Sequence, residues 1–277
     1  MRRVAILFFL VLASSRAEAG PNDLNLGGLV LRSSTPTFTD SVHTPLFIKL
    51  SAELGIAIAP QFTSPSETLG SLGFEVGFST AVTSIHQGES YWQWAKRGDE
   101  GVDRALALTS FHVRKGLPAS FELEGNFSWL ANSEMYALGL AVKWALNEGF
   151  YFIPDVAIRG SVNLLVGARD LQVVTSGFDL SLSKKFPVGG TSTLTPYAGY
   201  NLLIINSNSH VLDPTPLDAL DIEKNFVFSP QTIYVHRMFL GLRLKTYFVT
   251  LTGAVEFAFS KDIAWVQTYI GKLAFAF

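Results

Sequence analysis

Few residues in this sequence have types and spacing that could support chemistry. Ser110 and His112 stand two positions apart in the segment TSFHV, and residues two apart in a strand point to the same face. A hydroxyl beside an imidazole resembles a nucleophile and its base, but the imidazole also needs a carboxylate or an amide to orient it. The sequence places no such group beside this pair. It therefore predicts no enzyme and no catalytic residue, with hydrolysis as the least favoured alternative.

Other chemical motifs are missing from the sequence. The chain has no cysteine, no phosphate-binding loop and no spacing typical of a metal site. Asp213, Asp218, Asp221 and Glu223 lie in the segment 207–230, but their spacing matches no calcium loop. The formal net charge of −2 offers no basic surface to nucleic acid. We expect no cofactor, no metal and no nucleic-acid partner.

Another group of charged residues occupies the polar positions of an apolar–polar alternation. Its members are Lys49, Arg114, Lys143, Arg159, Arg237, Arg243 and Lys272, together with Glu53, Glu75, Glu122, Glu124, Asp155, Asp179 and Glu256. The two signs are equal in number. This balance favours ion pairs and hydrogen bonds, because a charge-selective pore usually has an excess of one sign at its constriction.

The elements that carry these charges are predicted to be long strands. Apolar residues recur at every second position along nearly the whole chain after residue 20, and period two indicates strands with one apolar and one polar face. The segments reach about 12–14 residues, whereas strands of soluble sandwiches are usually shorter. Strands of this length cross a bilayer when tilted. We predict an all-β fold, a transmembrane antiparallel up-and-down β-barrel of about 12 strands, with 10 or 14 as alternatives.

The charged positions then face the interior of the barrel and line its lumen. The predicted strands cover residues 24–33, 45–59, 71–85, 104–115, 118–131, 134–146, 151–165, 171–184, 194–206, 231–245, 247–259 and 265–277. If the last strand ends in the periplasm, the two longest connections, 86–103 and 207–230, are extracellular loops, as expected for this class. The connection 60–70 is long for the periplasmic turn that this strand count requires. The aromatic residues Tyr91, Trp92 and Trp94 are expected to anchor their loop at the lipid headgroups, with stacking on a ligand as an alternative.

The first residues, MRRVAILFFLVLASSRAEAG, predict a signal peptide. Two arginines precede an apolar run that is too short to span a bilayer, and small residues at Ala17 and Ala19 form a cleavage site. We therefore expect a signal peptide at 1–19 and a barrel domain at 20–277.

The last residues carry a resemblance to a known class of proteins. The chain ends on Phe277, and Phe275, Leu273 and Tyr269 alternate upstream of it. This ending is similar to the assembly signal of bacterial outer-membrane β-barrel proteins. The resemblance implies recognition by the barrel-assembly machinery and a location among the lipids of the bacterial outer membrane.

For such a barrel the sequence predicts a porin-like channel for small solutes, with a polar lumen that is partly filled by paired charges. Two alternatives remain open. One is a structural or surface-interaction barrel that presents the loops 86–103 and 207–230. The other is an outer-membrane lipid hydrolase built on the hydroxyl–imidazole pair.

Overall fold

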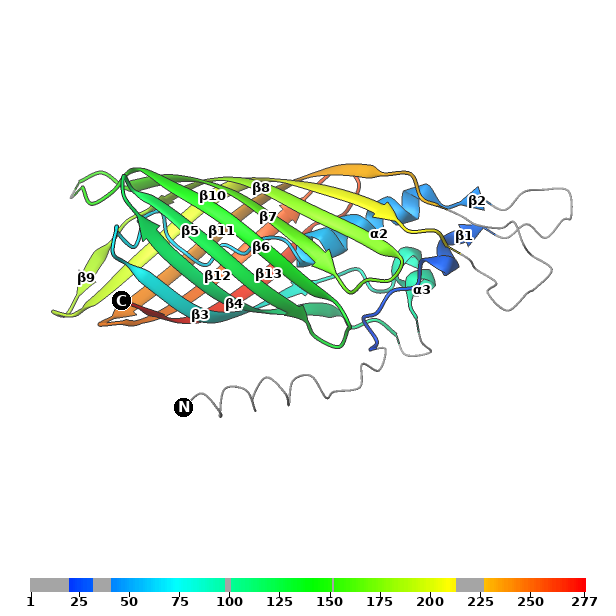
Figure 1. Cartoon of the computed structure of the whole chain (residues 1–277), viewed down its shortest axis with the longest axis horizontal. Helices are drawn as coiled ribbons and strands as arrows, with labels where there is room; N and C mark the ends of the chain where they lie inside the picture. Colours follow the sequence, from blue (N-terminus) through cyan, green and yellow to red (C-terminus); the bar gives the residue numbers. More distant parts are fainter. Residues whose placement is uncertain (1–19, 32–40, 98–100, 151, 213–226) are drawn as a thin grey trace, which may run out of the picture.

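The computed structural model describes residues 20–31, 41–97, 101–150, 152–212 and 227–277. The predicted signal peptide with Ala17 and Ala19, and the acidic residues of the segment 213–226, lie outside these residues. The described chain forms one closed barrel with a helix inside it (Figure 1).

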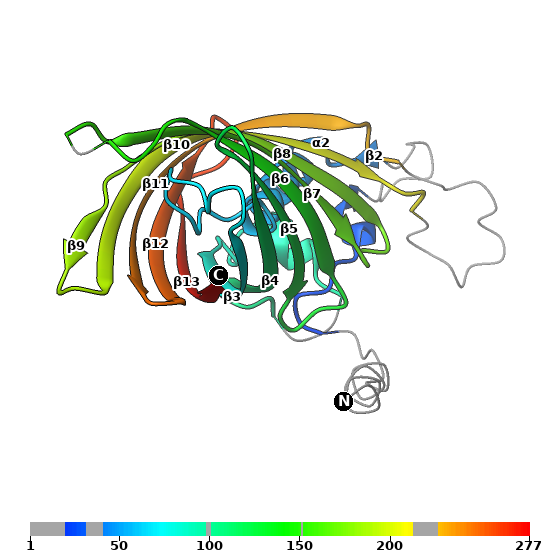
Figure 2. The same ribbon diagram turned by 60° about the vertical axis from the view of Figure 1, so that its left-hand side comes forward.

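Ten long strands form the barrel wall. They are β3 (Phe74–Ser84), β4 (Ala105–Leu117), β5 (Phe121–Leu130), β6 (Tyr136–Asn147), β7 (Asp155–Val166), β8 (Leu171–Ser183), β10 (Ser192–Ser209), β11 (Gln231–Thr246), β12 (Val249–Phe259) and β13 (Val266–Ala276). Every neighbouring pair is antiparallel, and the pairings of β13 with β3 and of β10 with β11 close the sheet. A short extra strand, β9 (Phe186–Val188), pairs with the start of β10. The strands are tilted and twisted around the barrel (Figure 2).

The two faces of the wall follow the period-two pattern. In β6 the outward residues Leu138, Leu140 and Val142 are exposed, whereas the inward residues Ala137 and Lys143 are buried. Burial alternates in the same way along β3, β8, β11 and β13. An apolar outer surface is suited to contact with lipid. A closed barrel also leaves no backbone edge unpaired in the membrane.

The two first predicted strands are wrong, which explains why the wall has ten strands. The segment 45–59 is a helix, α2 (Thr44–Ala57). The segment 24–33 forms the 3-10 helix η1 (Leu26–Leu29) and the two-residue strand β1 (Val30–Leu31), which pairs with β2 (Ser41–Val42). A second short helix, α3 (Ser90–Ala95), lies in the connection between β3 and β4.

The error at 45–59 has a physical cause. The helix lies inside the barrel, so it is apolar on most of its circumference, and an alternating pattern fits such a helix as well as a strand. Pro45 occupies the first turn, where proline is favoured, and Leu, Ala and Glu are good helix formers. Gly55 lets the helix approach the wall closely, since a Cβ there would lie 2.7 Å from the side chain of Ile205.

Candidate functional site

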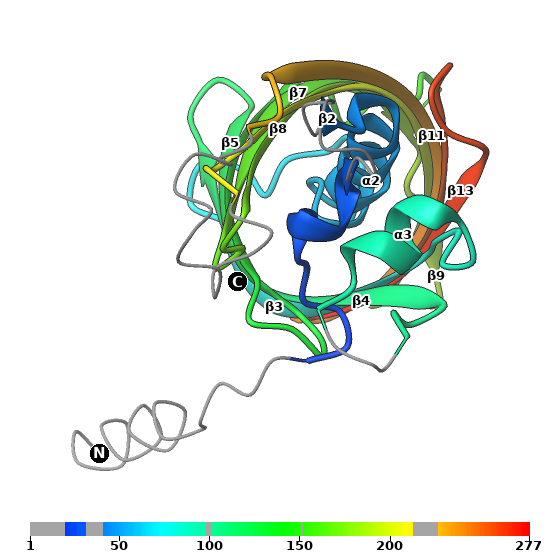
Figure 3. The same cartoon turned by 90° about the vertical axis from the view of Figure 1, so that its right-hand side faces the viewer.

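The candidate site is the lumen, which the N-terminal part of the described chain fills. We call residues 44–73 the plug, the end of the barrel beside Phe277 the C-terminal end, and the opposite end the mouth. The helix α2 enters at the mouth, and residues 58–73 continue as extended chain to the start of β3 at the C-terminal end. A view into the mouth shows α2 inside the ring of strands, with η1 and α3 beside it (Figure 3).

The lumen has an apolar half at the mouth. Its wall is formed by inward side chains that are buried together with α2 in one hydrophobic cluster, including Leu106, Leu108, Leu130, Leu165, Val173, Leu203, Ile205, Ile233, Val235 and Val266. Phe47, Leu50 and Leu54 of α2 are completely buried in this cluster. A helix satisfies its own backbone hydrogen bonds, so it can occupy an apolar lumen.

The charged half of the lumen lies toward the C-terminal end and surrounds the extended part of the plug. Pro60 and Pro65 keep this segment from being helical, so its carbonyl groups need other donors. Arg237 donates to the carbonyl of Pro60 at 3.3 Å, and Arg159 donates to that of Gln61 at 3.0 Å. Lys143 donates to two further plug carbonyls, those of residues 65 and 67, at 3.1 and 2.9 Å.

Other backbone groups of the segment are also bound by side chains of the wall. Tyr197 donates its hydroxyl to the carbonyl of Phe62 at 2.8 Å, and Asn163 donates to that of Ile58 at 2.7 Å. The amide of Phe62 donates to Glu256 at 3.1 Å, and the amide of Leu69 donates to Glu122 at 3.1 Å. Side chains of the charged wall therefore bind the backbone of the extended part of the plug.

The wall charges also pair with one another. Arg114 bonds Glu75 at 2.8 Å and contacts Glu122 as well, and Lys272 bonds Glu75 at 2.7 Å. Lys143 lies 3.0 Å from Glu122. In addition, Arg159 contacts Asp179, Arg237 lies 3.1 Å from Glu256, and Arg243 contacts Glu67 of the plug. Asp155 is buried at the start of β7, where it accepts a hydrogen bond from the amide of Gly149.

Two residues that the sequence assigns to the lumen wall belong to the plug. Lys49 lies on α2 and is exposed. Glu53 also lies on α2, and its carboxylate is completely buried. Since the strand at 45–59 does not exist, neither residue lines the wall as a strand residue. The other twelve lie on wall strands with buried side chains.

The Glu53 carboxylate is held by the connection between β3 and β4. The backbone amide of His86 and the indole of Trp92 donate to Oε2 at 3.1 and 2.7 Å. The hydroxyl of Tyr91 and the imidazole Nδ1 of His86 contact Oε1 at 2.8 and 2.5 Å. We call this arrangement the Glu53 clasp. Burial and the neighbouring carboxylate both raise the pKa of Tyr91, so its hydroxyl remains a donor.

The clasp changes the interpretation of the YWQW segment. Tyr91 and Trp92 are buried against the plug, at 4% and 1% exposure, and are therefore unavailable for stacking on a ligand or for a lipid interface. Trp94 is exposed and contacts His43 edge-to-face.

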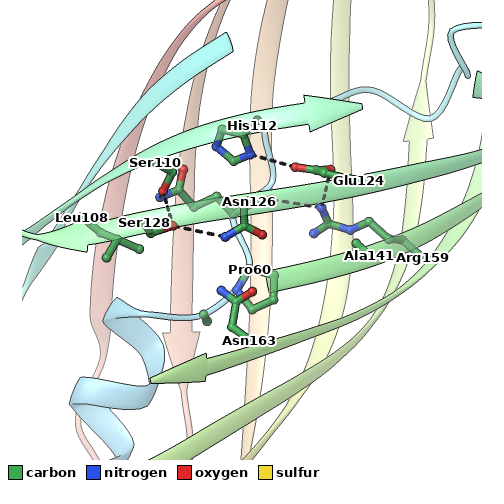
Figure 4. A pocket seen from close by; sticks show the side chains of 12 residues that line it. Pro60, Leu108, Ser110, His112, Glu124, Asn126, Ser128, Ala141, Arg159 and Asn163 are labelled. Atoms are coloured by element: carbon green, nitrogen blue, oxygen red, sulfur yellow. Dashed lines mark hydrogen bonds and ion pairs between the residues drawn. The ribbon is translucent and has the colours of Figure 1, made fainter. Parts of the chain in front are cut away.

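The hydroxyl–imidazole pair of the sequence is also rearranged. His112 contacts Ser79, not Ser110, with 2.6 Å between Nε2 and the hydroxyl oxygen. Its Nδ1 lies 2.9 Å from Glu124 (Figure 4). Register places these residues on the adjacent strands β3, β4 and β5. Sequence inspection missed the carboxylate because Glu124 is opposite Arg114 on the next strand, twelve residues away from the imidazole.

Beside this group lies a cavity of about 10 Å³, which is about the space of one water molecule. Its lining includes Glu124, Asn126, Arg159 and Asn163 from the wall and Gln61 from the plug. This cavity has no room for a solute larger than water.

Among the described residues, no cluster of three or more His, Cys, Asp or Glu side chains could hold a metal ion. None of the helices in the described part of the chain is long and apolar enough to cross a membrane.

The closed antiparallel wall, its apolar outer face and its buried polar interior define the chain as an antiparallel β-barrel of the membrane-spanning type. The sequence matches no family model and no curated protein sequence. The structure is similar to Ail, the attachment invasion locus protein of Yersinia pestis, with 9% identity, a TM-score of 0.30, and coverage of 75% of this chain and 99% of that chain. It is also similar to the N-terminal β-barrel domain of Pseudomonas aeruginosa OprF, with 10% identity, a TM-score of 0.31, and coverage of 75% and 99%. A third similar structure is the KdgM porin, with 8% identity, a TM-score of 0.34, and coverage of 73% and 99%.

Proposed function

We propose that this barrel is a gated passage for small solutes that its own plug closes at rest. The observation that carries the proposal is the way the charged half of the lumen holds residues 58–73. The wall binds the backbone of this segment through side chains such as Arg237, Arg159 and Lys143. All of these contacts are non-covalent, and displacement of the plug would leave a lumen lined by the same charges.

The structure changes the channel hypothesis in one respect. The sequence suggests a lumen that is partly filled by paired charges, whereas the plug occupies it as well. Conduction therefore requires movement of the plug, and the wild-type barrel is expected to be silent or to open rarely in a planar bilayer.

A disulfide lock tests the proposal directly. The hydroxyl oxygens of Ser66 on the plug and Ser181 on β8 lie 3.0 Å apart, so sulfur atoms in their places can reach the length of a disulfide bond. The chain has no cysteine, so Ser66→Cys with Ser181→Cys forms one defined bridge. The oxidised double variant should stay closed under voltage or mild urea, and reduction should restore openings. Ser66→Cys alone is the matched control, because it cannot form the bridge.

A second experiment can refute the proposal that the lumen is a passage for solutes. A full-length barrel and a variant lacking residues 44–68 are both reconstituted and shown to be folded by heat-modifiable migration on a gel. If neither conducts, the lumen does not serve as a passage.

A second candidate function rests on the mouth. The chain near Gly20 lies at the mouth, where the amide of Asn22 donates to the carbonyl of Asn132 at 3.1 Å, while Phe277 lies at the other end. Because η1 and α3 pack beside α2, the surface of the mouth includes helical segments. If the C-terminal end faces the periplasm, this surface faces outward and could bind partners. A tag at residue 20 that antibody reaches on intact cells would support this orientation.

A further inference from the structure

We propose that Ser79, His112 and Glu124 form a latent nucleophilic centre for acyl esters, which Gln61 of the plug covers. The distances fit the roles. The Ser79 hydroxyl lies 2.6 Å from Nε2 of His112, and Nδ1 of the same ring lies 2.9 Å from Glu124. These are the nucleophile–base and base–orienting contacts that a hydrolytic triad requires. Three adjacent strands of a rigid wall hold the side chains in place.

Gln61 occupies the position that a substrate would need. Its side-chain oxygen lies 2.7 Å from the Ser79 hydroxyl, and its side-chain nitrogen donates to Ser110 at 3.2 Å. A hydroxyl has one proton, so a serine that donates it to Gln61 does not donate it to the imidazole. The plug therefore blocks both the access to Ser79 and its activation.

The reaction is an acyl transfer followed by hydrolysis. The Ser79 oxygen bonds to the carbonyl carbon of the ester while its proton passes to Nε2 of His112. The bond from that carbon to the alcohol oxygen breaks, and the alcohol leaves with this proton. A water molecule then adds to the acyl group and gives a proton to Nε2, the acid is released, and the Ser79 oxygen recovers the proton.

The apolar half of the lumen indicates the substrate class. Leu106 and Leu108 lie on β4, on the mouth side of His112, and α2 covers them now. If the plug is displaced, as in the proposed function on which this substrate assignment rests, these side chains would surround a hydrocarbon chain. The centre would then act on esters that carry a long acyl chain.

A fluorophosphonate probe tests the centre without displacement of the whole plug. The full chain is folded in detergent, and probe attachment is mapped by mass spectrometry. Wild type should label weakly, and Gln61→Ala should label at Ser79. In the Gln61→Ala background, adding Ser79→Ala should abolish labelling, and adding His112→Gln should lower its rate by about a hundredfold or more. The control Ser110→Ala should keep it.

Glu124 positions the imidazole of His112 and does not touch the substrate. Its test therefore needs a measurement that would not change if Glu124 only stabilised the fold. Adding Glu124→Gln to the Gln61→Ala barrel should change the pH profile of labelling while heat-modifiable migration stays the same. The inference is overturned if the folded Gln61→Ala barrel does not label, if the probe attaches to Ser110 instead, or if the rate does not depend on His112.

The substrate class has a separate test. In mild urea, which lets an unlocked plug be displaced, the disulfide-locked barrel with Ser66→Cys and Ser181→Cys should not hydrolyse p-nitrophenyl palmitate, whereas its reduced form should. A reduced barrel without hydrolysis overturns the ester assignment. A barrel that labels after Gln61→Ala but never conducts keeps the nucleophilic centre and refutes the proposed passage.

Discussion

The Glu53 clasp allows a quantitative prediction, in which Tyr91→Phe loosens the plug without removing a ring from the core. The Tyr91 hydroxyl donates to the buried carboxylate at 2.8 Å. After the change, Oε1 keeps only the imidazole of His86, while Oε2 keeps both of its donors. A hydrogen bond to a charged group contributes about 1.5–3 kcal/mol. The free energy of local opening of α2 should fall by this amount.

Amide hydrogen exchange of the α2 peptide, followed by mass spectrometry, measures this free energy. A loss of about 1.5–3 kcal/mol corresponds to exchange that is roughly ten- to a hundredfold faster. Tyr234→Phe is the control, since Tyr234 faces outward and is 56% exposed. The reasoning fails if α2 exchanges at the wild-type rate in Tyr91→Phe, or if the control accelerates it as much.

The pH dependence of the clasp follows from the raised pKa of Tyr91. Burial is the larger cause and the Glu53 charge the second, and both act against ionisation of the phenol in the folded state. A group whose pKa is raised on folding stabilises the fold below its unfolded pKa and loses that contribution at higher pH. Protection of α2 should therefore be constant up to about pH 10, the usual pKa of tyrosine, and fall above it. In Tyr91→Phe this fall should disappear.

Three further predictions concern the plug end, the terminal strand and the lipid face. Burial tends to raise the pKa of Glu148, but hydrogen bonds led by the one from the Thr68 amide outweigh it and lower the pKa. This contact should hold the plug at Thr68 when the pH is above the usual pKa of a carboxyl group, and it should weaken as the pH falls below that value. Amide exchange near Thr68 should therefore become faster in acid in the wild type and not in Glu148→Gln. Phe277→Asp should leave the chain in the periplasm, and an unchanged outer-membrane yield would contradict the assembly-signal hypothesis. Leu240→Arg should lower the free energy of unfolding in lipid vesicles by about 2–4 kcal/mol, whereas Leu72→Arg, in a turn and 91% exposed, should change it little.

The wall of the barrel could be predicted because its physical rule is local. Each inward residue of β6 or β11 alternates with an outward one, so the sequence itself records which face meets lipid. The same rule selects twelve charged residues that lie on wall strands with buried side chains. The long connection 60–70 was already a poor fit to a periplasmic turn, and it is the extended part of the plug.

The composition of the site could not be predicted in the same way. The hydroxyl partner of His112 is on β3, because the register of β3 against β4 decides which hydroxyl meets the imidazole. The sequence offers the nearer Ser110 instead. Glu53 shows the other difficulty. Its place in an alternating segment indicates a wall residue, while its four contacts come from a connection more than thirty residues away.

A membrane-type barrel can be inferred from the sequence alone, because the apolar–polar alternation is a relation between neighbouring residues along the chain. What fills that barrel depends on contacts between segments that are far apart in the chain. An apolar helix inside a lumen and an apolar strand facing lipid both leave water, so hydrophobicity alone does not separate them. The difference lies in where backbone hydrogen bonds are satisfied: α2 satisfies its own within the helix, whereas residues such as Pro60 and Gln61 depend on Arg237 and Arg159 across the lumen.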